Sequence, residues 1–441
     1  MSFSIYDEFD IPEGWKPIKL KELADFNKEA WKKTNQPEHI HYIDIKSVST
    51  GTMEKPTYMS FSEAPSRARR IVNDGDIIIS TVRPNLKQFT IIENRNETNL
   101  TASTGFCTIR AKDEKFKWFI YAIITSDFFT RYLERTAEGA AYPAFKPIDI
   151  SESTVALPPE DELETISSIV KSLYRKKAVN NSMSATLEKI AQRIFKSWFV
   201  DFDPVKANAE GVPFDGLSPE IQALFPNEFE ESEFGMIPKG WEAKTFKDFC
   251  KSVSTGGTPK RSESSYWNGN VHWLSSGEVK KPISIETKEY ITELGLQKSA
   301  AKLWPVETVV IAMYGATAGE VTILANEMTT NQACCGLIPN DNSSFYLFIA
   351  ATLEKEKLAS KASGAAQQNL NKGIIETHQF IMPNNSLLEQ FDKTVRPLFN
   401  KWILNEQQNL GLSKIRDKLL PRLISGKITI QKAEELLEEA S

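Results

Sequence analysis

The sequence predicts a mixed α/β (α+β) fold class, arranged as two tandem copies of one domain, each followed by a long helix. Two observations lead to this prediction. The same short words return about 225 residues apart, and an apolar seam with helical spacing follows each set of words. A chain of 441 residues exceeds one domain of about 100–200 residues, so there is room for two copies.

Three pairs of matching words define the repeat. They are IPEGW at 11–15 with IPKGW at 237–241, GAA at 139–141 with GAA at 364–366, and LPP at 157–159 with MPN at 382–384. The separation is 226 residues for the first pair and 225 for the other two. This period is far longer than the roughly 20–50 residues of solenoid repeats, so it indicates a duplicated domain.

Within each copy, strand and helix patterns alternate. Residues 76–80 and 308–312 are short β-branched runs after a turn signal, which predicts one strand in each copy. Residues 116–135 and 345–360 predict helical stretches before the GAA words. The landmarks divide the chain into an N-terminal domain at 1–158, a helix at 159–200, an acidic connecting segment at 201–236, a C-terminal domain at 237–383, a second helix at 384–426 and a C-terminal tail at 427–441.

The two long helices carry apolar residues at alternating steps of three and four, which is the spacing of a coiled-coil seam. The first seam contains Leu163, Ile166, Val170, Leu173, Leu187, Ala191, Ile194 and Trp198, and the second contains Leu388, Phe391, Val395, Leu398, Trp402, Leu412, Leu419 and Leu423. The middle of each seam is polar, with Asn180 and Asn405 again 225 residues apart. About 38 residues at ~1.5 Å each make a helix of roughly 55–60 Å.

These helices are expected to pair with each other as an antiparallel coiled coil, which would relate the two domains by a pseudo-two-fold axis. A seam kept over five heptads is longer than one face of a globular helix usually needs. Polar residues at seam positions cost stability but fix register. The alternative is that each helix packs only on its own domain.

Charge and cysteine content limit the classes of protein. The net charge is −5, and residues 203–235 alone carry −7, so the rest of the chain carries +2 and gives no positive support for a nucleic-acid partner. Four scattered cysteines form no CxxC pair, which favours a reduced, cytoplasmic protein. No apolar run approaches the length of a membrane span, so we expect no membrane contact.

Loops rich in cations, glycine and amides are the candidates for contact with DNA, because such residues contact phosphates and base edges. The candidates are Arg67, Arg69, Arg70, Thr81, Arg83, Asn85 and Lys87 in the first copy, and Thr255, Gly256, Gly257, Thr258, Lys260, Arg261, Gln367, Gln368 and Asn369 in the second. Each signal alone is weak, since a basic cluster is usually a solvated face and a Gly-Gly-Thr-Pro run is usually a turn. Trp267 and Trp273 are expected in the core.

Catalytic motifs are absent from the sequence. There is no phosphate-binding loop of the GxxxxGK[ST] type, no methyl-donor loop, no adenine-methylation motif and no nuclease carboxylate cluster. His39 and His41 are better explained by a surface strand than by a metal site. The sequence therefore predicts a binding scaffold without catalytic residues, metal or cofactor. Two alternatives stay open: an enzyme with an unrecognised motif, and a coiled-coil scaffold that binds only proteins.

The whole layout resembles the specificity subunits of Type I restriction-modification systems. The resemblance rests on IPEGW and IPKGW at the domain starts, STVRPN at 80–85, ASTGF at 102–106, STGGTPK at 254–260, YWNG at 266–269, GAAQQNLN at 364–371, KSWFVDFDPV at 196–205 and KLLPRLISGKI at 418–428. These words are moderately specific one by one and highly specific in this order, and they cover nearly the full chain. Residues 142–145 depart from the amide-rich form of their word.

The resemblance implies that each domain is a target-recognition domain for one half of a bipartite, asymmetric site in double-stranded DNA, with the helices as a ruler between them. Two methyltransferase (modification) subunits would methylate adenine N6 with S-adenosylmethionine, and restriction subunits would add ATP-dependent, Mg²⁺-dependent translocation and cleavage. Those cofactors would belong to the partners, and the partners would dock on the helices and the segment 201–236.

Overall fold

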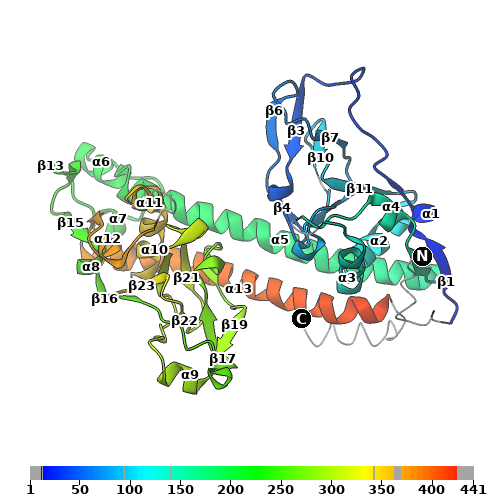
Figure 1. Ribbon diagram of the computed structural model, residues 1–441. Coiled ribbons are helices and arrows are strands. Elements are labelled where there is room, and N and C mark those ends of the chain that lie inside the picture. The colour runs from blue at the N-terminus through cyan, green and yellow to red at the C-terminus, as the bar shows by residue number, and fades with distance from the viewer. Residues whose placement is uncertain are drawn as a thin grey trace. The chain divides into compact units, whose positions relative to one another are not determined.

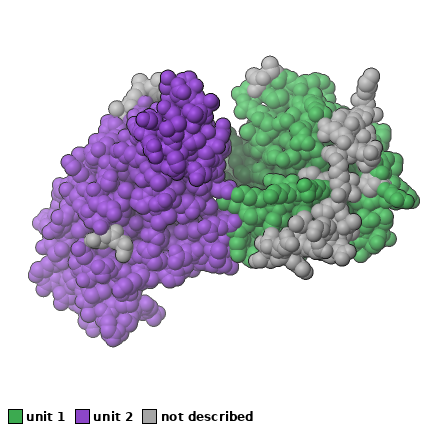
Figure 2. Space-filling model, turned by 90° about the horizontal axis from the view of Figure 1, so that it is seen from below, with its two compact units in different colours: residues 1–180, 408–441 green, residues 181–407 purple. Residues whose placement is uncertain are grey.

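The computed structural model describes residues 11, 13–93, 95–139, 142–340, 343–361 and 369–424. The chain divides into two compact units, which Figure 2 shows in green and purple. Unit 1 contains residues 1–180 and 408–441, and unit 2 contains residues 181–407. Each unit therefore combines one globular copy with part of both long helices.

Unit 1 is built from short strands and helices (Figure 1). In chain order they are β1 (Lys16–Lys19), α1 (Leu20–Leu23), β2 (Ala24–Phe26), β3 (His39–Ile43), β4 (Val48–Ser49), β5 (Thr52–Met53), β6 (Thr57–Ser60), β7 (Ala68–Ile71), β8 (Ile77–Ser80), β9 (Phe89–Ile91), β10 (Leu100–Ser103), β11 (Phe106–Ala111), α2 (Lys117–Ile124), α3 (Asp127–Thr136), α4 (Pro147–Ser151) and β12 (Thr154–Leu157). The long helices α5 (Glu160–Phe199) and α13 (Asn385–Leu423) enter this unit at residues up to 180 and from 408.

Unit 2 repeats this order of elements. After α6 (Asp203–Glu210), α7 (Pro219–Gln222), β13 (Phe229–Ser232) and β14 (Gly235–Pro238) come β15 (Glu242–Thr245), α8 (Phe246–Phe249), β16 (Cys250–Thr255), β17 (Trp267–Leu274), β18 (Ile283–Ser284), β19 (Glu289–Ile291), α9 (Glu293–Gln297), β20 (Val309–Ala312), β21 (Val321–Leu324), β22 (Thr329–Thr330), β23 (Cys334–Pro339), α10 (Ser344–Leu353), α11 (Lys355–Ser360), α12 (Lys372–Glu376) and β24 (Gln379–Met382).

The sheets of the two units have matching strand orders. One sheet has the order β2-β11-β8-β9 in unit 1 and β16-β23-β20-β21-β18 in unit 2. In a second sheet, β3 pairs in parallel with β10, as β17 pairs with β22. A two-stranded antiparallel sheet closes each copy, β1 with β12 and β15 with β24. The prediction of tandem α/β copies is confirmed, and the strands expected at 76–80 and 308–312 are β8 and β20.

The expected helical stretches are each broken into two helices. In the first copy the break lies between α2 and α3, where Thr125 Oγ1 donates to the carbonyl of Tyr121 and Ser126 Oγ accepts from the N–H of Phe129. The Thr125 hydroxyl satisfies a carbonyl at the end of α2, and the Ser126 hydroxyl satisfies an N–H group at the start of α3. Because these terminal groups are satisfied, one helix can end and another begin at this point. In the second copy Glu354 separates α10 from α11.

The core of unit 1 lies between the sheets and the helices. Every residue of α2 is buried, and β8 is buried along its whole length, so both belong to the interior of the copy. The same buried cluster includes Leu163, Ile166 and Val170 of α5 together with Leu420 of α13. The start of α5 therefore packs both on its own domain and beside α13.

The parts of α5 and α13 within unit 1 run in opposite directions. Ile169 clusters with Leu419 and Leu423, Lys177 Nζ donates to Ser413 Oγ at 3.1 Å, and Asn180 Nδ2 donates to Asn409 Oδ1 at 3.2 Å. Residues later in α5 therefore contact residues earlier in α13. Leu173 is half-buried at the edge of this contact and Leu412 is half-buried on α13.

The parts within unit 2 show the same opposite order. Asn405 Nδ2 reaches Ser184 Oγ at 3.5 Å, while Phe391 packs on Phe195 and Trp198 with ring centroids 5.7 Å apart in both cases. The other expected seam residues are placed as follows: Leu388 and Val395 are buried, and Leu187, Ile194 and Leu398 are half-buried.

The segment expected to be an acidic connection is folded. It forms α6, α7 and the β13–β14 hairpin, and Phe225 packs edge-on against Trp198 of α5. Asn208 Nδ2 donates to the carbonyls of Gln222 and Phe225, which ties α6 to α7. Among the described residues, no helix is both long and apolar enough to cross a membrane.

Candidate nucleic-acid interface

Three loops of the first copy meet where β8 ends. The N–H of Thr81 donates to the carbonyl of Gly105 at 2.8 Å, and the carbonyl of Thr81 accepts from the N–H of Phe145 at 3.1 Å. The N–H of Arg83 donates to the carbonyl of Pro143 at 2.7 Å. We call this region the N-terminal junction, and it comprises residues 67–70, 81–87, 103–105 and 142–145.

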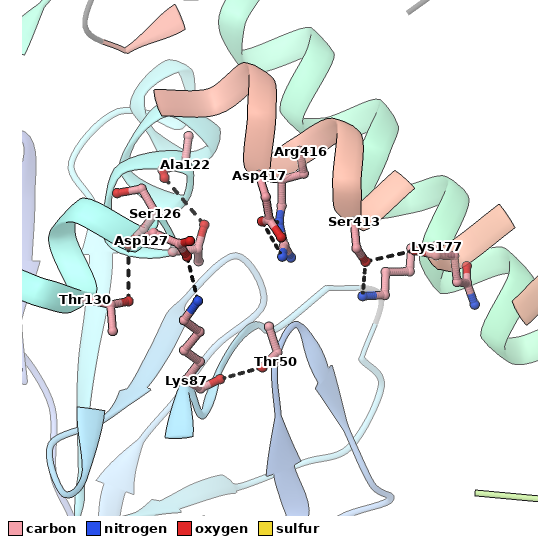
Figure 3. A network of polar contacts seen from close by, with 12 residues as sticks. Thr50, Lys87, Ala122, Ser126, Asp127, Thr130, Lys177, Ser413, Arg416 and Asp417 are labelled. Carbon is pink, nitrogen blue, oxygen red and sulfur yellow. Dashed lines mark hydrogen bonds and ion pairs between the residues drawn. The ribbon is translucent and has the colours of Figure 1, made fainter. Parts of the chain in front are cut away.

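The loop after β8 is held in a strained conformation. Arg83 and Lys87 have positive φ angles of 52° and 49° and flank a single 3-10 turn, Pro84–Leu86. This conformation is costly for residues other than glycine, so tertiary contacts have to stabilise it. Lys87 supplies two of them (Figure 3): its Nζ donates to Asp127 Oδ1 at 2.5 Å, and its carbonyl accepts from Thr50 Oγ1 at 3.0 Å. Lys87 thus shapes the loop.

Three candidate residues of the N-terminal junction have exposed side chains. Arg83 lies over the ring of Tyr142, with its guanidinium carbon 4.5 Å from the ring centroid. Arg67 pairs with Asp44 at 3.1 Å. Asn85 is exposed on the 3-10 turn. These three side chains are therefore accessible to a ligand.

The remaining candidates of this junction are more constrained. Arg69 lies over the ring of Phe61 at 5.0 Å and donates to the carbonyl of Ala68. The Nε of Arg70 is buried and, among the described residues, has no hydrogen-bond partner. The hydroxyl of Thr81 donates to the carbonyl of Gly105 at 2.9 Å. These side chains build the junction more than they face solvent.

The second copy has an equivalent meeting point, which we call the C-terminal junction; it comprises residues 255–261, 313–317, 330–333 and 369–370. The N–H of Met313 donates to the carbonyl of Ala333 at 2.8 Å, and the carbonyl of Met313 accepts from the N–H of Leu370 at 2.8 Å. Met313 thus makes the same two backbone bonds that Thr81 makes in the first copy.

Gly256 and Gly257 are required by close packing. A Cβ on Gly256 would lie 2.4 Å from the carbonyl oxygen of Thr330, and one on Gly257 would lie 2.4 Å from the carbonyl carbon of Ala300. Their N–H groups donate to the carbonyls of Cys334 and Thr330. Because these N–H groups are occupied within the protein, a DNA contact by this loop has to come from neighbouring side chains.

Arg261 is the most firmly held cation of the C-terminal junction. Its guanidinium carbon lies 3.8 Å from the ring centroid of Trp267 and 4.7 Å from that of Trp273, and both terminal nitrogens donate to Glu289. The hydrogen bonds from Arg261 lower the pKa of the Glu289 carboxyl. Trp273 is buried and its indole N–H donates to the carbonyl of Gly257 at 3.1 Å, so the stack also fixes the glycine loop.

Other candidates of this junction are more open. The Lys260 side chain is 70% exposed and pairs with Glu263 at 3.3 Å. Thr258 Oγ1 donates to Gln332 Oε1 at 2.6 Å. Thr255 ends β16 and is half-buried. The Oδ1 of Asn369 is buried and has no partner among the described residues. Gln367 and Gln368 lie outside the described residues.

Four residues that the sequence did not single out lie at the junctions. Thr104 and Gln332 are exposed on equivalent turns, after β10 and after β22, and Tyr142 and Tyr314 are exposed tyrosines. A fixed repeat of 225 or 226 residues would align Thr81 with residue 306 or 307, whereas the hydrogen bonds align it with residue 313. If the two copies are aligned on the buried strands β8 and β20, residues 313–317 fall at the position of the loop that begins at Thr81.

No described cysteine has the character of a nucleophile. All four are buried and free, and burial raises the pKa of the Cys107, Cys250 and Cys335 thiols to about 12. His39 stacks on Tyr58 of β6 with ring centroids 5.2 Å apart, and the ring of His41 is tilted against the same tyrosine at 5.1 Å. Within the described residues, no group of three or more His, Cys, Asp or Glu side chains could hold a metal ion.

Comparison with known proteins shows which proteins this chain resembles. The chain is 27% identical over 439 residues to the Type I restriction enzyme HindI specificity subunit of Haemophilus influenzae, covering 88% of this chain and 95% of the relative. It is 26% identical over 437 residues to the MjaIX specificity subunit of Methanocaldococcus jannaschii, covering 96% and 95%.

A solved structure of a Type I restriction-modification system S subunit from M. genitalium shares the fold, with a TM-score of 0.55, 14% identity, and coverage of 94% of this chain and 96% of that one. The family described as Type I restriction modification DNA specificity domain matches residues 12–189 and 238–410. These two matches fall on the two copies and together cover more than half of the sequence. The chain belongs to the family of Type I restriction-modification DNA specificity proteins.

Proposed function

We propose that this chain is the DNA sequence-specificity subunit of a Type I restriction-modification complex and reads a bipartite, asymmetric site in double-stranded DNA. The observation that carries the proposal is the duplicated junction in a chain of this family. The same backbone bonds at Thr81 and Met313 hold three loops together in each copy. Their exposed side chains differ, so each junction can read a different half-site.

The long helices form one antiparallel coiled coil that spaces the two recognition domains with pseudo-two-fold symmetry. The reversed order of contacts within each unit supports this, as do the polar pairs Asn180–Asn409 and Ser184–Asn405 near mid-helix. Helices of 40 and 39 residues are ~60 Å long at ~1.5 Å per residue, which is somewhat more than one turn of DNA at ~34–36 Å. The recognition domains are residues 1–158 and 237–383.

The partners are two methyltransferase subunits and the restriction subunits. A groove of about 910 Å³ in unit 2 supports docking on α5 and the hairpin β13–β14. Lys189, Arg193 and Lys357 line it together with Met236 and Leu353, which are exposed apolar side chains. Such a surface suits a partner with apolar and acidic side chains.

The chain itself performs no catalysis in this proposal. The assembled complex is an adenine-N6 DNA methyltransferase and an ATP-dependent endonuclease. S-adenosylmethionine, ATP and Mg²⁺ bind to the partner subunits. The adenine to be methylated leaves the duplex and enters the pocket of the methyltransferase subunit. The protein works in the cytoplasm, where the DNA and these partners are found.

The test is genome-wide mapping of N6-methyladenine with and without this gene, combined with DNA binding by the chain and its methyltransferase subunit. We expect one bipartite motif to lose methylation when the gene is absent, and binding to weaken as salt rises. Unchanged methylation together with DNA binding that is insensitive to salt would overturn the proposal in favour of a scaffold that binds only proteins.

A further inference from the structure

Exposed tyrosines are rare in this chain, and their places are informative. Of the tyrosines in the described ranges, only Tyr58, Tyr142 and Tyr314 are largely exposed, at 62%, 68% and 43%. Tyr142 lies at the N-terminal junction and Tyr314 at the C-terminal junction. They come from different loops, Tyr142 from the loop after α3 and Tyr314 from the loop after β20. Each junction therefore carries an exposed tyrosine, and the two tyrosines come from different segments of their copies.

Tyr142 lies close in sequence to a pair of backbone hydrogen bonds. Glu138 and Ala144 exchange these two bonds, each 2.9 Å long. The following residue, Pro143, accepts the N–H of Arg83, and the ring of Tyr142 carries the Arg83 guanidinium on its face at 4.5 Å. A cation over an aromatic face is attracted electrostatically by the ring, so this contact helps to position Arg83.

Tyr314 is held equally firmly. It follows Met313, whose N–H and carbonyl are both bonded within the junction. It precedes a single 3-10 turn (Gly315–Thr317), where Gly315 has a φ of 76° and Thr317 Oγ1 donates to the carbonyl of Ser276 at 2.9 Å. The backbone on both sides of Tyr314 is thus fixed while its side chain stays exposed.

We propose that Tyr142 and Tyr314 are DNA-contact residues, one for each half-site, whose phenol O–H donates to a phosphate oxygen while the ring packs beside the sugar. This inference rests on the proposed function. A rigid exposed aromatic loses little conformational entropy on binding, and tyrosine is among the side chains that donate to DNA phosphates.

The test uses the chain in complex with its methyltransferase subunit and duplexes that carry the mapped motif. The variants are Tyr142→Ala, Tyr314→Ala and their Phe counterparts, with Tyr58→Ala as the matched control, because Tyr58 is as exposed but lies on β6 away from the junction bonds. Each duplex is also made with one half-site scrambled, so that the affected half can be assigned.

We expect Tyr142→Ala to weaken binding to the intact site by roughly tenfold, the size of one lost DNA contact. The same substitution should weaken binding less when the N-terminal half-site is scrambled, because the loop then no longer docks in register on that half. Tyr314→Ala should behave in the same way toward the other half. The Phe variants should bind more weakly without changing the preferred sequence, because a phosphate contact does not read bases. Tyr58→Ala should bind as the unchanged chain does.

Two outcomes overturn the inference. If the unchanged complex prefers the bipartite site and both alanine variants bind it equally well, the tyrosine contacts are wrong while the proposed function stands. If the unchanged complex shows no preference for a bipartite site, the proposed function and the tyrosine contacts fail together. Unfolding curves should match for all variants, since each altered side chain is exposed.

Discussion

The N-terminal and C-terminal junctions share a backbone arrangement and differ in almost every exposed side chain. Thr81 and Met313 make equivalent hydrogen bonds, yet Arg83 lies over Tyr142, whereas Arg261 lies against Trp267 and Trp273 and is bonded to Glu289. A scaffold fixed by backbone bonds lets the side chains change without loss of the fold. The comparison teaches that one domain can be duplicated and that the exposed side chains of its junction can then diverge while the backbone arrangement is kept.

The largest effect is expected where the shared scaffold itself is broken. Phe145 and Leu370 are buried, and their N–H groups donate to the carbonyls of Thr81 and Met313 respectively. Phe145→Ala should lower the free energy of unfolding by about 3–5 kcal/mol and Leu370→Ala by about 2–5 kcal/mol, through lost burial and the cavity left behind. Urea unfolding of the two variants measures this. Losses below 1 kcal/mol in either would mean that the junctions are not equivalent anchors.

A buried carboxyl on the long helix α13 has no acidic counterpart at the matching position of α5. Burial raises the pKa of Asp392 on α13 to about 6, with Arg396 opposing the shift and Glu307 adding to it, while the position 225 residues earlier is the uncharged Ser167. Since the pKa is higher in the folded chain than its ordinary value of 3.8, this group favours folding fully below pH 3.8 and loses that contribution as pH rises through 6.

Asp392→Asn should therefore remove this pH dependence. Relative to the unchanged chain, it should gain about 1–3 kcal/mol in unfolding free energy on going from pH 4 to pH 7. Unfolding curves at several pH values provide the measurement, with Ser167→Asn as a control that should show no such change. A parallel pH dependence in Asp392→Asn and the unchanged chain would contradict the assignment.

Removal of the two arginines should separate a structural role from a contact role. Arg261→Ala should destabilise unit 2 by about 1–2 kcal/mol, because two ring contacts of about 0.5–1 kcal/mol each are lost. Arg83→Ala removes the contact with the exposed Tyr142 ring and should lower DNA affinity, as Arg261→Ala should. Unchanged stability of Arg261→Ala would show that the two tryptophan contacts do not hold the loop.

The smallest effect is expected at Lys260, which is exposed and paired only with Glu263. Lys260→Ala should leave stability within about 0.5 kcal/mol and reduce the salt dependence of DNA binding by about one phosphate contact. Binding titrations at several salt concentrations supply the slope. An unchanged slope would place Lys260 outside the DNA interface.

The duplicated architecture and the long helices could be predicted because they depend on local patterns. A seam with steps of three and four fixes a helix, and α5 and α13 begin and end within three residues of the expected limits. The confirmed strands β8 and β20 are short buried runs after turn signals. The burial of such a segment is indicated by the spacing of its own apolar residues, so it can be predicted without knowledge of the rest of the fold.

The make-up of the junctions could not be predicted because it depends on contacts between distant segments. The candidate loops 81–87 and 255–261 follow β8 and β16, which are not equivalent strands, since β8 matches β20. Gly256 and Gly257 suggested phosphate contacts, but their N–H groups bond to the protein. Nothing near Arg261 in sequence indicated that Trp273 and Glu289 would hold it.

The most direct test of the central claim, that two copies of one module read two half-sites, is a chain in which residues 11–158 replace residues 237–383. Both segments begin at the same word and end before a long helix, so the exchange keeps the repeat in register. N6-methyladenine mapping of cells that carry this chain and its methyltransferase subunit should show an inverted repeat of the N-terminal half-site. Methylation of the original asymmetric motif would contradict the claim, as would a hybrid that still binds the methyltransferase subunit but directs no new motif.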